Sequence, residues 1–301
     1  MTLELRRMSR LKADSLLLAV AALWGVAFVA QKSAMASIGP LTFIAARTLL
    51  ASMVLAPLAI WESRKQPHAI SPSFLKMASL AACALLIGST LQQFGLLTAT
   101  VTNASFLTAL YAVYTPFVAW LMLKTPPAAV VWPATALSFI GVWLLGGATI
   151  GALSVGDALI AISAPLWAFH IVVTGLGARA GRPFLFTALQ FGFVSIVASI
   201  AAVAFEAPAL QALRDVGWQI AYVGIVSSAV TFTIFTIAMR HAPAAEAALI
   251  LSTENLFAAL AGGLLMGDRL GAINWMGASL IIAAVLLVQF AIYRRQPAAC
   301  R

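Results

Sequence analysis

Ten runs of apolar residues, each long enough to cross a lipid bilayer, follow one another along this chain. The hydrocarbon core of a bilayer is about 30 Å thick, and a helix needs about 20 residues to span it. Of the 301 residues, 62% are hydrophobic and 9% are charged. A soluble domain carries about 25% charged residues, so most of this surface must face lipid. We therefore predict an all-α membrane protein with ten transmembrane helices. They span residues 13–36, 41–61, 73–95, 102–123, 129–148, 156–178, 184–204, 216–239, 244–266 and 271–293.

The basic residues are distributed unevenly between the two sides of the predicted membrane. With a cytoplasmic N-terminus, fourteen of the 18 Lys and Arg residues lie in cytoplasmic segments. Lys32, Arg214 and Arg269 lie outside, and Arg47 falls within the second helix. Because Lys and Arg concentrate in cytoplasmic loops, we expect a multi-pass protein of the inner (plasma) membrane with both termini in the cytoplasm. The net charge of +9 then reflects topology and contact with anionic lipid, and we expect no nucleic-acid partner.

The two halves of the chain resemble each other at a constant offset of 143 residues. Several rare residue types match at this offset without a gap: Asp14 with Asp157, Trp24 with Trp167, Pro40 with Pro183 and Trp132 with Trp275. We therefore predict two five-helix repeats over residues 13–148 and 156–293. Because five is odd, the second repeat enters the membrane from the opposite side. Inverted repeats are typical of transporters that hold their substrate between the halves, near the bilayer midplane.

The segments that carry the repeat resemble a known family. Residues 23–32 and 36–43 are similar to the opening of an EamA domain of the drug/metabolite transporter superfamily, and residues 103–110 resemble its fourth helix. The second copy supplies similar segments in the same order at residues 156–157, 166–168, 187–191 and 267–270. The resemblance covers nearly the whole chain. Within the family, the branch of YddG-type aromatic amino acid exporters looks closest.

This resemblance implies ten helices in two inverted halves, cytoplasmic termini and a central cavity for organic metabolites. Two positions depart from the family pattern. Lys124 and Thr125 stand where the family usually has Gly-Glu, which leaves the role of that loop open. Asn255 stands where a proline commonly follows the glutamate of the ninth helix, which puts the local shape around Glu254 in doubt.

Glu254 is the first candidate for the substrate site, because a carboxylate deep in an apolar helix faces a cavity or a partner. It could bind a proton or a substrate ammonium group, or be held structurally by a neighbouring helix. His170 could bind an anionic group or couple to protons, although packed histidines are common. Trp24 and Trp167 occupy equivalent positions in the two repeats. Each ring either stacks on substrate or fills the seam between the halves.

Further polar residues in the apolar helices complete the predicted set of substrate-binding residues. These are Gln92, Gln93, Tyr111 and Gln190, which either line the cavity or join helices by hydrogen bonds. The offset pairs Gln190 with Arg47. We expect Arg47 to extend toward the outer interface, with orientation of a substrate carboxylate as the alternative. We expect Glu246, near the cytoplasmic boundary, to be solvated.

We expect a secondary transporter that exports aromatic and other neutral amino acids, or similar small metabolites, by alternating access. A multidrug exporter of lipophilic cations is the alternative, since an apolar cavity with one carboxylate also suits such ions. A membrane enzyme or scaffold is a weaker one. The chain has no P-loop, no Gly-x-Ser-x-Gly elbow and no HExxH motif, and Cys83 and Cys300 lack metal-ligand spacing. We therefore expect no enzyme activity, cofactor or metal, and the oligomeric state is left open.

Overall fold

The computed structural model describes residues 8–145, 154–266 and 270–295, and all regular structure in these ranges is helical. In chain order the helices are α1 (Arg10–Ala34), α2 (Pro40–Lys65), α3 (Pro72–Gly95), α4 (Val101–Thr108), α5 (Tyr111–Leu123), α6 (Val131–Leu145), α7 (Val155–Ala178), α8 (Pro183–Phe205), α9 (Leu210–Asp215), α10 (Gly217–Ala221), the π-helix η1 (Tyr222–Val230), α11 (Thr231–Met239), α12 (Ala244–Leu251), α13 (Glu254–Met266) and α14 (Ala272–Arg295).

All of these helices except the short α9 belong to the ten predicted spans, and together they confirm the all-α membrane fold. Among the described residues, nine segments are long and apolar enough to cross a membrane, and the tenth, α6, is a shorter apolar helix of 15 residues. Three spans are composite: α4 with α5, α10 through η1 to α11, and α12 with α13. The end of the first predicted domain, residues 146–148, lies outside the described residues.

Proline and small polar residues set where the helices begin. Pro40, Pro72 and Pro183 are the first residues of their helices, where a missing N–H leaves no bond unmade. The Ser71 hydroxyl accepts from the Phe74 N–H at the start of α3. At the start of α7, Ser154 and Asp157 form a reciprocal capping box. Such caps satisfy N–H groups that have no partner within the helix.

Two spans are broken in the middle, and the breaks are related by the repeat. The sequence predicted uninterrupted helices over 102–123 and 244–266, which is wrong in this respect. The first span breaks at Ala109–Leu110 and the second at Ser252–Thr253, positions that differ by the same 143 residues. Tight turns carry the chain through both breaks, with Ala112 N donating to Ala109 O and Leu256 N to Thr253 O, each at 2.9 Å.

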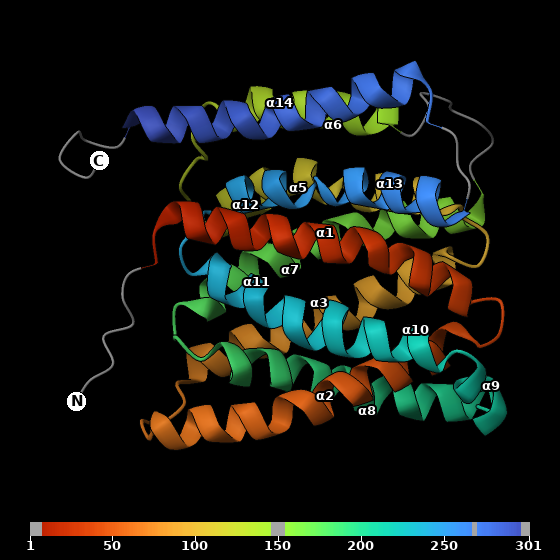
Figure 1. Cartoon of the computed structure of the whole chain (residues 1–301). Helices are drawn as coiled ribbons and strands as arrows, with labels where there is room; N and C mark the ends of the chain where they lie inside the picture. Colours follow the sequence, from red (N-terminus) through yellow and green to blue (C-terminus); the bar gives the residue numbers. More distant parts are fainter. Residues whose placement is uncertain (1–7, 146–153, 267–269, 296–301) are drawn as a thin grey trace.

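Equivalent helices of the two repeats pack against each other at opposite edges of the bundle. In Figure 1, α6 and α14 lie together at one edge, and α2 and α8 lie together at the other. Between these edges, α1 packs on α11 and η1, while its counterpart α7 packs on α3. The same holds for the broken spans: α13 packs on α1, and α5 packs on α7. Each contact therefore has a counterpart in which the repeats exchange roles, as a pseudo-two-fold axis requires.

The two repeats are inverted relative to each other. Successive spans run in alternating directions, so α7, which is the sixth span, runs opposite to α1, which is the first. The α6–α14 contact is a close one: a Cβ built on Gly141 would lie 2.8 Å from the carbonyl oxygen of Gly277. A Cβ on Gly277 would in turn collide with the Gly141 carbonyl oxygen. Glycine at both positions lets the backbones approach closely, as in many membrane helix pairs.

Candidate substrate site in a buried central cavity

A cavity of about 60 Å³ lies at the seam between the two repeats. The first repeat contributes wall residues from α1 to α5, and the second contributes them from α7, η1, α11 and α13. Both broken spans reach it, through Tyr111 at the start of α5 and Glu254 at the start of α13. Discontinuous helices mark substrate sites in many inverted-repeat transporters. The cavity is therefore the candidate substrate site.

Six of the eight residues predicted to bind substrate line this cavity: Trp24, Gln92, Tyr111, Trp167, His170 and Glu254. The offset of 143 pairs Trp24 with Trp167 and Tyr111 with Glu254, and predicts that both pairs meet near the centre. The structure places all four side chains on the cavity wall. Their contact with a substrate stays a prediction.

Gln190 lies behind the cavity wall and supports His170. Its Oε1 accepts from His170 Nε2 at 2.7 Å, and its Nε2 donates to the carbonyl oxygen of Phe186 at 3.2 Å. Because the amide nitrogen is committed to Phe186, the oxygen faces the imidazole, and His170 is the donor. This bond holds the ring against the cavity, beside Trp167 and Phe232.

Gln93 also lies away from the cavity wall. Its side chain is fully buried, and neither amide atom has a hydrogen-bond partner in the part of the chain that the structure describes. Gln92, one residue earlier on α3, lines the cavity and donates to the Thr108 hydroxyl at 2.9 Å. Consecutive residues on a helix point in different directions, so only one of the two glutamines can face the cavity.

The acidic part of the site consists of Glu254 and Tyr111. Glu254 is 3% exposed, and the Tyr111 hydroxyl lies beside its carboxylate. Within the described ranges, neither Glu254 Oε1 nor the Tyr111 hydroxyl has a partner in hydrogen-bond geometry. A Cβ on Gly25 would lie 2.5 Å from the Glu254 carbonyl oxygen, so glycine lets α1 pack directly on the break that presents this carboxylate.

The two tryptophans of the cavity differ in how firmly they are held. Trp24 Nε1 donates to the Ser227 carbonyl oxygen at 3.0 Å and to the Thr231 hydroxyl at 2.9 Å. Its ring also packs at a tilt against Phe232 and Phe235. Ser227 belongs to η1, and π-helical segments occur often at functional sites. Trp167 Nε1, by contrast, is buried and has no hydrogen-bond partner among the described residues.

Arg47 also lines the cavity, which corrects the expectation that it extends to the outer interface. The side chain is 7% exposed, and its guanidinium carbon lies 5.9 Å from the centre of the Phe43 ring. Arg47 was absent from the predicted site, as were the other wall residues Ala27, Phe28, Gln31, Thr108, Ile171, Ser227, Phe232 and Phe235. Its position seven residues into a membrane helix was the available signal.

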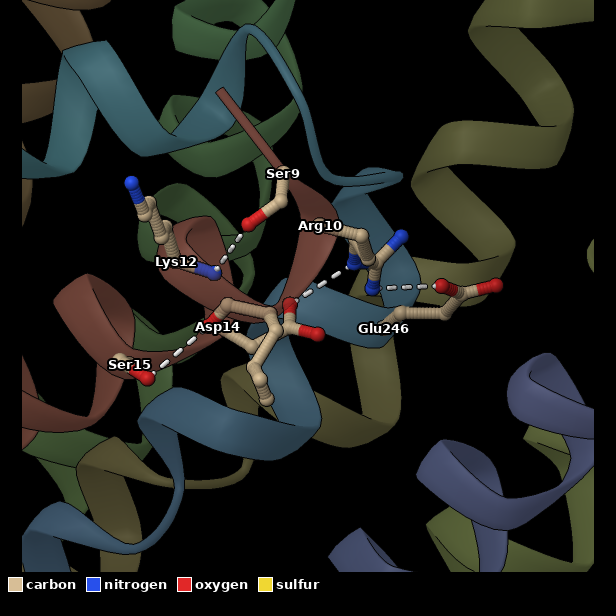
Figure 2. A network of polar contacts seen from close by, with 7 residues as sticks. Ser9, Arg10, Lys12, Asp14, Ser15 and Glu246 are labelled. Atoms are coloured by element: carbon tan, nitrogen blue, oxygen red, sulfur yellow. Dashed lines mark hydrogen bonds and ion pairs between the residues drawn. The ribbon is translucent and has the colours of Figure 1, made fainter. Parts of the chain in front are cut away.

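At the end of the bundle where α1 begins, Arg10 forms an ion pair that links α1 to the second repeat. Figure 2 shows its guanidinium between Asp14 on α1 and Glu246 on α12. Arg10 Nε lies 2.8 Å from Asp14 Oδ1, and a terminal nitrogen lies 2.7 Å from Glu246 Oε2. Glu246 is 8% exposed, so the expectation that it is solvated is wrong. Its ion-pair partner Arg10 is far away in the sequence, so the pair could not be predicted from the sequence alone.

A bundle of apolar spans in two inverted repeats, with a partly polar cavity between them, is typical of membrane transport proteins. The model of the EamA-like transporter family matches residues 11–147 and again residues 154–290. The chain therefore belongs to the EamA-like transporter family.

Two curated relatives match nearly the full chain. An uncharacterized transporter of Archaeoglobus fulgidus is 27% identical over 280 residues, covering 93% of this chain and 86% of its own length. The uncharacterized transporter YwfM of Bacillus subtilis is 24% identical over 277 residues, covering 89% of this chain and 90% of its own. A solved crystal structure superposes with a TM-score of 0.75 at 13% identity, covering 96% of this chain and 100% of its own, which shows a shared fold.

Proposed function

We propose that this protein is a secondary transporter of the inner membrane that exports neutral amino acids, aromatic ones among them. The observation that carries the proposal is the composition of the central cavity. It combines aromatic rings from both repeats with one buried carboxylate, Glu254, and one buried guanidinium, Arg47. A zwitterion with an apolar side chain offers a partner to each of these groups. The expected placement in the YddG-type branch agrees with this substrate class.

The proposed mechanism is alternating access around this cavity. The site lies at the seam of the inverted repeats, and both broken spans reach it. Movement of one repeat against the other would open the cavity to one side of the membrane at a time. The fourteen-to-three distribution of basic residues supports cytoplasmic termini, and with them a cytoplasmic location of the Arg10–Glu246 ion pair.

Export of lipophilic cations is the second candidate function. Glu254 beside Trp24 and Trp167 supports it, because aromatic faces and a carboxylate both attract organic cations. Arg47 in the same cavity argues against it, because a bound cation would leave the guanidinium without a counter-charge. Binding and transport without chemical change account for these residues, so we propose no enzyme activity.

Counterflow in proteoliposomes tests the proposal. Vesicles containing the purified protein are loaded with each of the twenty amino acids in turn, and uptake of a labelled aromatic amino acid is measured. We expect aromatic and other neutral amino acids to drive exchange, and charged ones to fail. Protein-free vesicles are the control. Counterflow of labelled tetraphenylphosphonium into vesicles loaded with ethidium or tetraphenylphosphonium, with no exchange of amino acids, would favour the second candidate.

A further inference from the structure

One hydrogen-bonded pair beside the cavity in the second repeat has no equivalent in the first. In the second repeat, His170 on α7 is hydrogen-bonded to Gln190 on α8. The offset of 143 carries His170 to Ala27 on α1 and Gln190 to Arg47 on α2. The first repeat thus has a methyl group in place of the imidazole and a guanidinium in place of the amide. Ala27 and Arg47 both line the cavity.

Arg47 has no counter-charge in the part of the chain that the structure describes. Among the described residues, its buried Nε has no hydrogen-bond partner, and no carboxylate, that of Glu254 included, lies within ion-pair distance of the guanidinium. An isolated charge in a membrane interior is costly, so such groups face a partner or a cavity. In the second repeat the equivalent side chain is satisfied by His170, and in the first repeat Ala27 has no polar side-chain atom that could pair with Arg47.

We propose that Arg47, with the space beside Ala27, is the subsite that binds the substrate carboxylate. This inference rests on the proposed function and deepens it. A guanidinium presents parallel N–H donors that match the two oxygens of a carboxylate. Glu254, on the same cavity but not paired with Arg47, then receives the substrate ammonium group. An α-amino acid brings one charge to each of the two groups and leaves neither uncompensated.

The test compares two ligands that differ only in the carboxylate, phenylalanine and phenethylamine. Their affinities are measured by isothermal titration calorimetry on the purified protein in detergent, and counterflow of labelled phenylalanine is measured in proteoliposomes. In the wild type we expect phenylalanine to bind more tightly than the amine. Arg47→Gln, which installs the residue of the other repeat, should weaken phenylalanine binding about 10- to 100-fold. The affinity for phenethylamine should change less than about 3-fold.

A second variant probes the space rather than the charge. Ala27→His installs the imidazole of the other repeat and should exclude the carboxylate, so that phenylalanine binding falls while the amine still binds. Arg214→Gln is the matched control, since it removes an exposed arginine of α9 and should leave both affinities unchanged. Size-exclusion profiles verify that each variant is folded.

The remaining outcomes decide between the subsite and its rivals. Equal losses for phenylalanine and phenethylamine in Arg47→Gln would show that Arg47 supports the fold, and would overturn the subsite alone. Phenethylamine binding that requires chloride in the wild type, and loses this requirement in Arg47→Gln, would assign Arg47 to an inorganic anion and would also overturn it. A wild type that exchanges no amino acid would overturn the proposed function, and the subsite with it.

Discussion

Glu62 and Glu206 form reciprocal caps: Glu62 of α2 caps the start of α8, and Glu206, which follows α8, caps the start of α2. Glu62, near the end of α2, accepts from the Phe184 and Leu185 N–H groups at the start of α8. Glu206, just after α8, accepts from the Leu41 and Thr42 N–H groups at the start of α2. Carboxylates stabilise helix N-termini because they satisfy free N–H groups and complement the helix dipole. The two caps therefore tie the α2–α8 pair together at both ends.

Glu206→Gln should lower the stability of this pair without affecting the cavity. The neutral amide keeps the shape but loses the charge and one of the acceptor oxygens that face Leu41 and Thr42. We expect a loss of about 1 kcal/mol of unfolding free energy, seen as a lower melting temperature in detergent. Asp215→Asn, at an exposed carboxylate on α9, is the control and should melt like the wild type. Equal melting of Glu206→Gln and the wild type would contradict the cap's contribution.

Substitution of the two cavity tryptophans by phenylalanine should have unequal effects on stability. Trp24→Phe removes an indole N–H that donates to Ser227 and Thr231, and should destabilise the protein by about 1 kcal/mol. Trp167→Phe removes an N–H that has no partner within the described residues, and should leave melting nearly unchanged. Thermal unfolding of both variants, with and without substrate, makes the comparison. The reverse order of stability would refute it.

Glu254→Gln should impair exchange while leaving folded protein at normal levels. The amide keeps the size of the side chain but cannot neutralise a substrate ammonium group, so we expect affinity for amino acids to fall about 10-fold or more. The pH dependence of exchange should also change, because a titratable group has been removed. Tyr111→Phe, which keeps the carboxylate, should have the smaller effect. Unchanged affinity and an unchanged pH profile in Glu254→Gln would show that Glu254 contributes only to packing.

Loss of the ion pair between Arg10 and Glu246 should favour opening of the cavity at that end. At the opposite end the offset carries Glu246 to Asn103, which offers no charge. With Cys83 and Cys300 replaced by serine, Ser227→Cys reports access to the cavity. Glu246→Gln should speed its labelling from the cytoplasmic side about 5-fold, the equivalent of about 1 kcal/mol. Lys12→Gln, at an exposed neighbour, is the control. Identical labelling rates would exclude a closing function for the pair.

Cysteine labelling also tests the orientation of the chain. The structure places Gln66 and Gly181 at the same end of the bundle, since Gln66 Nε2 donates to the Gly181 carbonyl oxygen at 3.2 Å. A cysteine at Gln66 should react only from the cytoplasm, and one at Ala209 only from outside. A further site suited to the outer side, Gly151, lies outside the described residues. Labelling of both positions from the same side would invalidate the ten-span topology.

The spans were predictable from sequence because bilayer thickness sets their length and hydropathy marks them directly. The breaks after Thr108 and Leu251 were not predicted. Neither break carries a proline or glycine, and the short polar run at residues 252–255 is hidden when hydropathy is averaged over a whole span. Rare side chains at matching positions, such as Trp24 and Trp167, identified part of the cavity wall. Hydropathy does not show which face of a helix lines the cavity. The sequence therefore predicted Gln93 and Gln190 as cavity residues, although neither lines it.

The depth of a charged residue within its span was also insufficient to predict whether its side chain is buried or exposed. Arg47 is close enough to the start of α2 for its long side chain to reach a membrane interface, and only the packed structure shows that it turns inward. Glu246 looked solvated because its partner, Arg10, belongs to the other repeat. In both cases the deciding contact joins segments that are far apart along the chain.

In the proposed alternating-access cycle, the residues next to the paired breaks are expected to move least. A span made of two short rods joined at a tight turn can tilt at either end without dragging the other, as a hinge does. Tyr111 and Glu254 are the first residues beyond the two turns, so they lie close to the pivots. A substrate bound there would stay almost stationary while the two repeats move around it. The same binding site would then be used in both the substrate-loading and the substrate-releasing conformations.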